Sequence, residues 1–293
     1  MKKLFLYLLM PLLAMSSCNQ KNEEEAKPVN DGKKYKVTLS VASQEKKDFG
    51  VMADDEVIPL KDLVNQLSVI AFDQNGNEIG RMTRTSNDPQ FGTFVMDLPA
   101  GELTVVAVGS KTPFEFNEFY KKSGATSVML PFSSANFQYL QGDALPGQRA
   151  YKTDDTFFSR RKINVTKPSD IPMVLTRIIG KLLVTVEDFD DYYVTVKNDA
   201  AGFMLEDERS AFGIQIDHST RIYNGKKSFC GYILRTDRPL ELEIRAGGKT
   251  RELTVPIYKN QVTVVTGRFV PKIPDFRLYI DNRWSTDTTR VQF

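Results

Sequence analysis

The chain has 293 residues, of which 41% are hydrophobic and 26% are charged, and its formal net charge is +2. This composition is typical of a globular protein, excludes an intrinsically disordered one, and leaves enough length for two domains of ordinary size. A net charge so close to zero argues against nucleic-acid binding, and the one short basic cluster, Arg160 to Lys162, is interpreted as a solvated strand end.

The first 17 residues have the features of an export signal. Lysines at positions 2 and 3 are followed by an apolar stretch from Leu4 to Met15 and then by two serines. The apolar stretch is too short to cross a bilayer, since a membrane helix needs about 20 such residues. We therefore expect residues 1–17 to be removed as a signal peptide and not kept as a membrane span.

Cys18 is the candidate lipidation site. A cysteine directly after small residues at the end of an export signal resembles the lipobox of bacterial lipoproteins, whose thiol is acylated and becomes the new N-terminus. The sequence Met15-Ser16-Ser17 departs from the Leu-Ala-Gly that most often precedes that cysteine, and a chance cysteine beside an ordinary cleavage site is the alternative.

Residues 18–34 are predicted to form a flexible tether, because Asn19 to Pro28 has no large apolar side chain that could join a core. The acidic run Glu23 to Glu25 resembles the signal that sends Bacteroidota lipoproteins to the outer face of the outer membrane. A solvated linker that carries no such signal is the alternative interpretation of this run.

Residues 35–170 are predicted to form a first β-sandwich domain. Short runs rich in β-branched and aromatic residues are separated by turn signals such as Asp73 to Gly76, and apolar and polar residues alternate within them. This period of two is the pattern of strands with one buried face. The predicted strands are Tyr35–Val41, Leu67–Phe72, Ile79–Thr85, Thr93–Leu98, Leu103–Val108 and Arg160–Val165.

A long insertion from Gly109 to Tyr151 interrupts this pattern. Four aromatic residues gather in it, and Asn117 to Ser123 is predicted to form one or two helical turns. Loops of this length are often functional. The aromatic cluster either stacks on a sugar or contacts a partner, or it seals the end of the sandwich. Its members are Phe114, Phe116, Phe119 and Tyr120.

Residues 171–293 are predicted to form a second β-sandwich domain. It contains the stretch Leu175 to Val186, in which Ile178, Leu182, Val184 and Val186 line one face. Asn224 and Gly225 are typical of a type I′ β-hairpin turn leading into the next strand. The predicted strands are Ile171–Leu175, Tyr192–Val196, Ser228–Leu234, Leu240–Arg245, Thr250–Ile257, Val262–Val265 and Phe276–Ile280.

No constellation for catalysis is found in the sequence. His218 is the only histidine, and no serine or cysteine signature accompanies it. The run Gly247 to Thr250 lacks the earlier glycine and the following helix of a phosphate-binding loop. The acidic pairs at 54–55, 154–155 and 190–191 lack the regular spacing of a calcium loop and are interpreted as turn residues. We therefore expect a protein that is not an enzyme, with no catalytic, cofactor-binding or metal-binding residues.

With Cys18 acylated, Cys230 has no disulfide partner, and its apolar neighbours predict a core position.

Five short stretches carry a family resemblance: Leu67–Gly76, Leu98–Val108, Leu175–Val186, Ile257–Thr266 and Ile280–Trp284. They are similar to the FimB-type fimbrial anchor and accessory subunits of the Bacteroidota fimbrillin superfamily. The resemblance implies two tandem transthyretin-like, Greek-key β-sandwiches whose subunits assemble by exchange of β-strands. In the family's stalk subunits an arginine protease removes an N-terminal strand, whereas the anchor subunits keep their lipid at the membrane.

No arginine lies between Cys18 and Arg81, so an arginine-specific protease has no site near the first strand. This favours a surface-exposed, lipid-anchored subunit of the outer membrane that anchors a fimbrium and serves cell adhesion. The strand Tyr35–Val41 would then stay in place, and Phe276–Phe293 would contact the next fimbrial subunit. The alternatives are a fimbrial stalk or tip subunit, a surface lipoprotein that binds a glycan or host ligand through the aromatic insertion, and a structural lipoprotein without a fibre.

Overall fold

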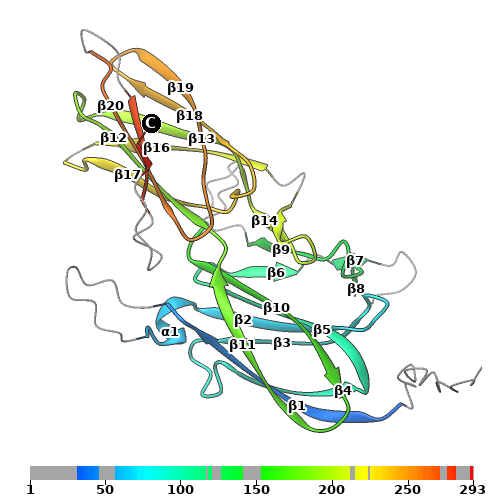
Figure 1. Ribbon diagram of the computed structural model, residues 1–293. Coiled ribbons are helices and arrows are strands. Elements are labelled where there is room, and N and C mark those ends of the chain that lie inside the picture. Colours follow the sequence, from blue (N-terminus) through cyan, green and yellow to red (C-terminus); the bar gives the residue numbers. More distant parts are fainter. Residues whose placement is uncertain are drawn as a thin grey trace, which may run out of the picture.

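The computed structural model describes residues 32–45, 57–116, 118–120, 127–140, 153–211, 215–223, 225–270, 276–281 and 291–292. Within those ranges the regular structure consists of twenty-two β-strands and one four-residue helix, α1 (Leu60–Leu63). The prediction of an all-β fold is therefore confirmed. In Figure 1 the strands of the first half of the chain, blue to green, lie below those of the second half, yellow to red. The export signal, Cys18 and most of the tether lie outside the described residues.

Seven strands of the first half form one sheet in the order β3-β2-β5-β10-β11-β1-β4. β10 and β11 pair only at Phe157 with Arg177 and at Phe158 with Thr176, and the remainder of β11 runs parallel to β1. The sheet therefore divides into two arms, β3-β2-β5-β10 and β11-β1-β4, which share one apolar core. The strands are β1 (Lys34–Ser43), β2 (Gln66–Phe72), β3 (Glu78–Thr85), β4 (Thr93–Pro99), β5 (Gly101–Ser110), β10 (Thr156–Val165) and β11 (Ser169–Arg177).

This core lies between the two arms because alternate residues of each strand point inward. Val37 and Leu39 of β1 are fully buried, and they share the core with Val69 of β2 and Val105 of β5. β1 has a neighbour on each side, antiparallel β4 and parallel β11, so it is not an edge strand.

Two further sheets form from the second half, a five-stranded one in the order β17-β12-β20-β21-β22 and a four-stranded one in the order β16-β13-β18-β19. Leu182 and Val184 of the first sheet and Val194 and Ile244 of the second are fully buried in a shared core. Two sheets with a common core make a β-sandwich; the transthyretin-like topology stays a prediction. The strands are β12 (Gly180–Val186), β13 (Tyr192–Ala200), β16 (Gln215–Ile222), β17 (Ser228–Ile233), β18 (Leu240–Ala246), β19 (Lys249–Val255), β20 (Val262–Gly267), β21 (Phe276–Asp281) and β22 (Val291–Gln292).

A third apolar cluster lies where the two halves meet. A four-stranded sheet in the order β15-β14-β9-β6 combines β6 and β9 of the insertion with β14 and β15 of the second half. Phe137 of β9 contacts Phe203 of β14, and the same cluster includes Phe158 of β10 and Ile179. The halves are therefore joined by packing as well as by the chain. The strands are β6 (Phe114–Phe116), β9 (Asn136–Tyr139), β14 (Gly202–Met204) and β15 (Arg209–Ser210), and β7 (Glu118–Tyr120) pairs separately with β8 (Ser127–Met129).

The expected division between the two domains, at residues 170 and 171, falls within a strand. Residues 170 and 171 lie inside β11, which pairs with β1 of the first sheet. The stretch Leu175 to Val186 is not one strand, because β11 ends at Arg177 and β12 begins at Gly180. We propose that the two domains divide at Ile178 and Ile179, where the chain leaves the first sheet for the second sandwich.

Four smaller expectations are wrong. Glu118 to Tyr120 forms β7 and not a helical turn, although the rest of 117–123 lies outside the described residues. Asn224 and Gly225 do not close a hairpin, since β16 and β17 on either side of them belong to different sheets. Arg160 to Lys162 lies in the middle of β10 and not at a strand end, and Cys230 is exposed and not in the core.

Candidate assembly site

The first strand fills a closed position in the sheet. Val37 and Leu39 are fully buried and Val41 is 6% exposed, and all three point into the first core. Burying one such side chain stabilises a fold by about 1.5–3 kcal/mol, so the three together contribute roughly 5–9 kcal/mol. Removing β1 would expose the apolar residues on either side of it, among them Phe94 of β4 and Met173 of β11.

A buried ionic cluster fastens the end of β1. The Arg177 guanidinium donates to Asp155 Oδ1 at 2.7 Å and to Glu45 Oε2 at 2.7 Å, and it also donates to Asn260 Oδ1 at 2.8 Å. The guanidinium carbon lies 4.8 Å from the centre of the Phe157 ring. Arg177 is 6% exposed, so these contacts form away from bulk water.

The position of these partners explains what the cluster does. Glu45 follows β1, Asp155 precedes β10, and Asn260 lies between β19 and β20 of the second half. One side chain at the end of β11 therefore connects the first strand, the first sheet and the second sandwich. Hydrogen bonds in which donor or acceptor is charged are about twice as strong as neutral ones.

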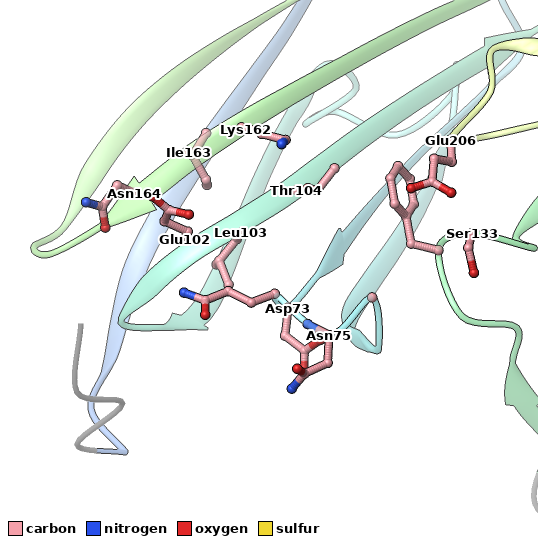
Figure 2. Close-up of a pocket in the computed structure, with 13 residues that line it drawn as sticks. Asp73, Asn75, Glu102, Leu103, Thr104, Ser133, Lys162, Ile163, Asn164 and Glu206 are labelled. Carbon is pink, nitrogen blue, oxygen red and sulfur yellow. Dashed lines mark hydrogen bonds between the residues drawn. The ribbon is translucent and has the colours of Figure 1, made fainter. Parts of the chain in front are cut away.

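A polar cleft of about 580 Å³ lies beside the turn between β2 and β3 (Figure 2). The turn is held in shape because the Asp73 carboxylate accepts the backbone N–H groups of Asn75 and Asn77. The N–H of Phe132 donates to the carbonyl of Gly76 at 2.8 Å, which joins the turn to the neighbouring layer. The lining is mostly polar and includes Glu102, Lys162, Asn164 and Glu206.

The sequence-predicted glycan platform is not formed by the aromatic residues proposed for it. Phe114 is 3% exposed and Phe116 is 6% exposed, because both pack into the cluster between the halves. Phe114 and Phe116 therefore seal the end of the sandwich, which is the second of the two interpretations of the aromatic cluster given above. Phe119 and Tyr120 have side chains outside the described residues.

The remaining candidates form no catalytic arrangement in the described part of the chain. His218 Nε2 lies 3.2 Å from Asp199 Oδ2, but neither is joined to a nucleophile. Asp191 binds Arg221, and the described residues hold no group of three or more His, Cys, Asp or Glu that could bind a metal ion. No helix in the described ranges is long and apolar enough to cross a membrane. Cys18, the predicted lipidation site, lies outside those ranges.

The described residues thus form β-sandwich sheets whose first strand is paired on both sides. A sequence model of the family described as fimbrillin-A associated anchor proteins Mfa1 and Mfa2 matches residues 23–282. The chain belongs to this family, which confirms the resemblance to fimbrial anchor and accessory subunits. The family consists of fimbrial structural and adhesin proteins and not of enzymes.

Solved structures of proteins from Porphyromonas and Bacteroides share the fold. The fimbrial anchor protein Mfa2 from Porphyromonas gingivalis has a TM-score of 0.55 and 12% sequence identity, over 88% of this chain and 99% of that one. A candidate polysaccharide-binding protein from Bacteroides thetaiotaomicron has a TM-score of 0.56 and 10% identity, over 88% of this chain and 98% of that one. A candidate adhesin from Bacteroides ovatus has a TM-score of 0.55 and 11% identity, over 89% and 95%. No curated protein sequence matches the chain.

Proposed function

We propose that this protein is a surface lipoprotein of the outer membrane that anchors a fimbrium, held by lipid on Cys18 and joined to other fimbrial subunits by β-strand addition. Membership of the fimbrial family supports the fimbrial role. The observation that carries the anchor role is β1, which is buried and paired on both sides in its sheet, with no arginine before it in the mature chain.

The lipid supplies a durable attachment. Each buried methylene contributes about 0.8 kcal/mol, and two or three acyl chains hold a protein at a membrane where one chain is marginal. From Cys18 to Lys34 the tether reaches at most about 55 Å when fully extended. The folded body therefore stays close to the membrane but is able to turn.

The retained strand separates an anchor from a stalk subunit. While β1 pairs with both β4 and β11, no donor strand from another subunit is able to enter between them. The first domain of an anchor would therefore end the fibre, and contact with the next subunit would use another sheet edge. A stalk or tip subunit is the alternative, and it would need β1 to be cut away.

Processing and fibre retention test this function together. We expect surface protein to begin at an acylated Cys18 by mass spectrometry, and Cys18→Ser to release the subunit and its fibres into the medium. Thr250→Ser is the control, because it changes one exposed side chain of β19 and should leave fibres on the cells. A mature N-terminus beyond Ser43, or fibres that stay attached without the lipid, would contradict the anchor role.

Glycan binding in the polar cleft is the second candidate function. The cleft is favoured by its size, which suits a small ligand, and by the Phe132 ring beside carboxylate, amide and ammonium groups. One protein of the same fold is described as a candidate polysaccharide-binding protein. Glycan-array binding that is lost in the double variant Lys162→Ala and Glu206→Gln, and kept in Lys249→Ala, would support it. Equal binding by all three would exclude the cleft.

A further inference from the structure

Most sheet edges in the described part of the chain carry residues that discourage pairing with another strand. Charged side chains and proline on an edge strand are the usual protection against unwanted β-pairing. Charged residues lie on three edge strands, β3, β16 and β19. The edge strand β4 has Asp97 and Pro99. In β10, the basic run Arg160 to Lys162 lies where β11 no longer pairs with it. The basic run is therefore explained as edge protection.

β17 is different. Its six residues, Ser228 to Ile233, include neither a charged residue nor proline. It is the end strand of the five-stranded sheet and pairs with β12 on one side, and no described strand pairs with the other side. Near the opposite end of the same sheet, β21 already has a partner on each side, β20 and β22.

The side chains of β17 alternate between the core and the surface. Phe229 and Ile233 point into the core of the second sandwich, whereas Ser228 and Cys230 are exposed on the other face. The ring of Phe229 occupies the place that a Cβ on Gly231 would take, at 2.7 Å, so the glycine is explained by packing within the strand. β17 therefore presents an uncharged edge with apolar residues on its inner face.

We propose that the outer edge of β17 receives an extended strand from another fimbrial subunit. This rests on the proposed function and specifies the edge through which the anchor contacts its fibre. The added strand would continue the five-stranded sheet, satisfy the outward N–H and C=O groups of β17, and place alternate apolar side chains beside Phe229 and Ile233.

Charge favours a different subunit over a second copy of this chain. Lys226 and Lys227 precede β17, and Arg235 follows it. If two copies paired antiparallel through β17, Lys226 of each would lie opposite Arg235 of the other; if they paired in parallel, the lysines would lie beside their own copies. Like charges placed opposite each other on paired strands are destabilising. The edge therefore selects an uncharged strand flanked by acidic residues.

Cross-linking in cells tests the edge. A photo-activated benzophenone amino acid is placed at Ser228 of the full-length lipoprotein, and the cross-linked peptide is identified by mass spectrometry. We expect a peptide from another fimbrial subunit. We also expect maleimide labelling of Cys230 to be at least about tenfold slower on fibre-bearing cells than on cells whose major fimbrial subunit is deleted, a ratio that corresponds to about 1.4 kcal/mol. A cross-link to a second copy would overturn the partner assignment, and no cross-link with equal labelling would overturn the edge.

Lysines placed on the edge give a second test. Ser228→Lys with Cys230→Lys should release fibres while the lipoprotein stays folded and surface-exposed. Thr250→Lys with Thr254→Lys is the matched control, because it adds the same charge to exposed positions of β19, an edge already protected by charge. Fibres kept by both variants would overturn the proposal. If Cys18→Ser releases fibres but the β17 double variant does not, the proposed β17 edge is wrong and the anchor role stands. If fibres stay on the cells in Cys18→Ser as well, the anchor role itself is wrong.

Discussion

The Arg177 cluster allows a sharp test of what holds the first strand in place. Arg177→Met keeps a long side chain but removes the guanidinium, which leaves the carboxylate of Asp155 in a site where its side chain is 9% exposed. Removing one partner of a buried ion pair costs about 3–5 kcal/mol, because the remaining charge stays buried without compensation. At about 2–4 °C per kcal/mol, the melting temperature should fall by roughly 6–20 °C.

An exposed ion pair of similar geometry provides the control. Arg221 donates to Asp191 at 2.9 and 2.7 Å, but the two side chains are 50% and 55% exposed. Water and salt screen such a pair, so Arg221→Met should change the stability little. The two variants differ mainly in burial, and burial is the cause that the comparison isolates.

Urea unfolding followed by circular dichroism measures both variants on the mature chain with Cys18 replaced by serine. Adding Asp155→Asn to Arg177→Met should restore part of the lost stability, since no lone carboxylate is then buried. If Arg177→Met and Arg221→Met shift the urea midpoint equally, or if Asp155→Asn destabilises the double variant further, the reasoning about buried charge is refuted.

Three further predictions follow from burial, from a hydrogen-bonded carboxylate and from the fold. Leu39→Ala should lower the free energy of unfolding in urea by about 2–5 kcal/mol. Val95→Ala, at a position 43% exposed, should change the same free energy by less than about 0.5 kcal/mol. Similar losses of stability in the two variants would contradict the buried position of β1. Burial disfavours the ionised form of Asp188, but the N–H groups of Phe269 and Val270 that donate to its carboxylate outweigh this and lower its pKa. The ionised Asp188 carboxylate therefore stabilises the fold at a pH above its pKa in the unfolded chain, and this stabilisation is lost as the pH falls through its pKa in the folded protein. The difference in melting temperature between wild type and Asp188→Asn should then shrink from about pH 7 to about pH 3. A difference that stays constant would contradict this role of the carboxylate. The far-UV circular dichroism spectrum should be that of a β-protein, and strong helical minima would exclude this fold.

Local patterns predicted the strands but not their partners. The alternation around Leu39 indicates a strand with one buried face, since side chains on a strand point to opposite faces in turn. Nothing near Val37 shows that it pairs in parallel with Ser169, because that pairing depends on how a long stretch of chain closes. Parallel pairing requires a long connection, and sequence alternation carries no information about where such a connection ends.

The errors in the sequence-based prediction arise because local patterns do not show how strands pair and pack. Apolar residues continue past the end of β11, because Ile178 and Ile179 pack into the cluster between the halves, so the hydrophobic pattern does not show where β11 ends. Asn224 and Gly225 have the chemistry of a tight turn, but the strands on either side go to different sheets. Apolar neighbours predicted a buried Cys230, whereas the side chain points to the opposite face of β17 from Phe229 and Ile233 and is exposed.

The residues of the candidate site also differ in how far the sequence alone can predict their roles. The lipidation of Cys18 is proposed from a pattern that is local in sequence, so that proposal does not depend on the fold. Arg177 is one charged residue among many in the sequence, and its role depends on Glu45 and Asp155 arriving beside it from distant segments. Residues whose role arises from tertiary contacts carry no local signal.

In the proposed anchor, tension from the fibre would pass through the strands described here. A pull on the tether acts along β1, and because β1 is hydrogen-bonded to β4 and β11 on both sides, it loads two ladders at once instead of opening one bond at a time. β11 continues through Ile178 and Ile179 into β12, and β12 pairs with β17. A fibre strand on β17 would therefore be connected to the membrane through β12, β11 and β1. Arg177 lies at the middle of this path and holds Glu45 after β1 and Asn260 of the second half, so the cluster that stabilises the fold would also keep the two halves together under load.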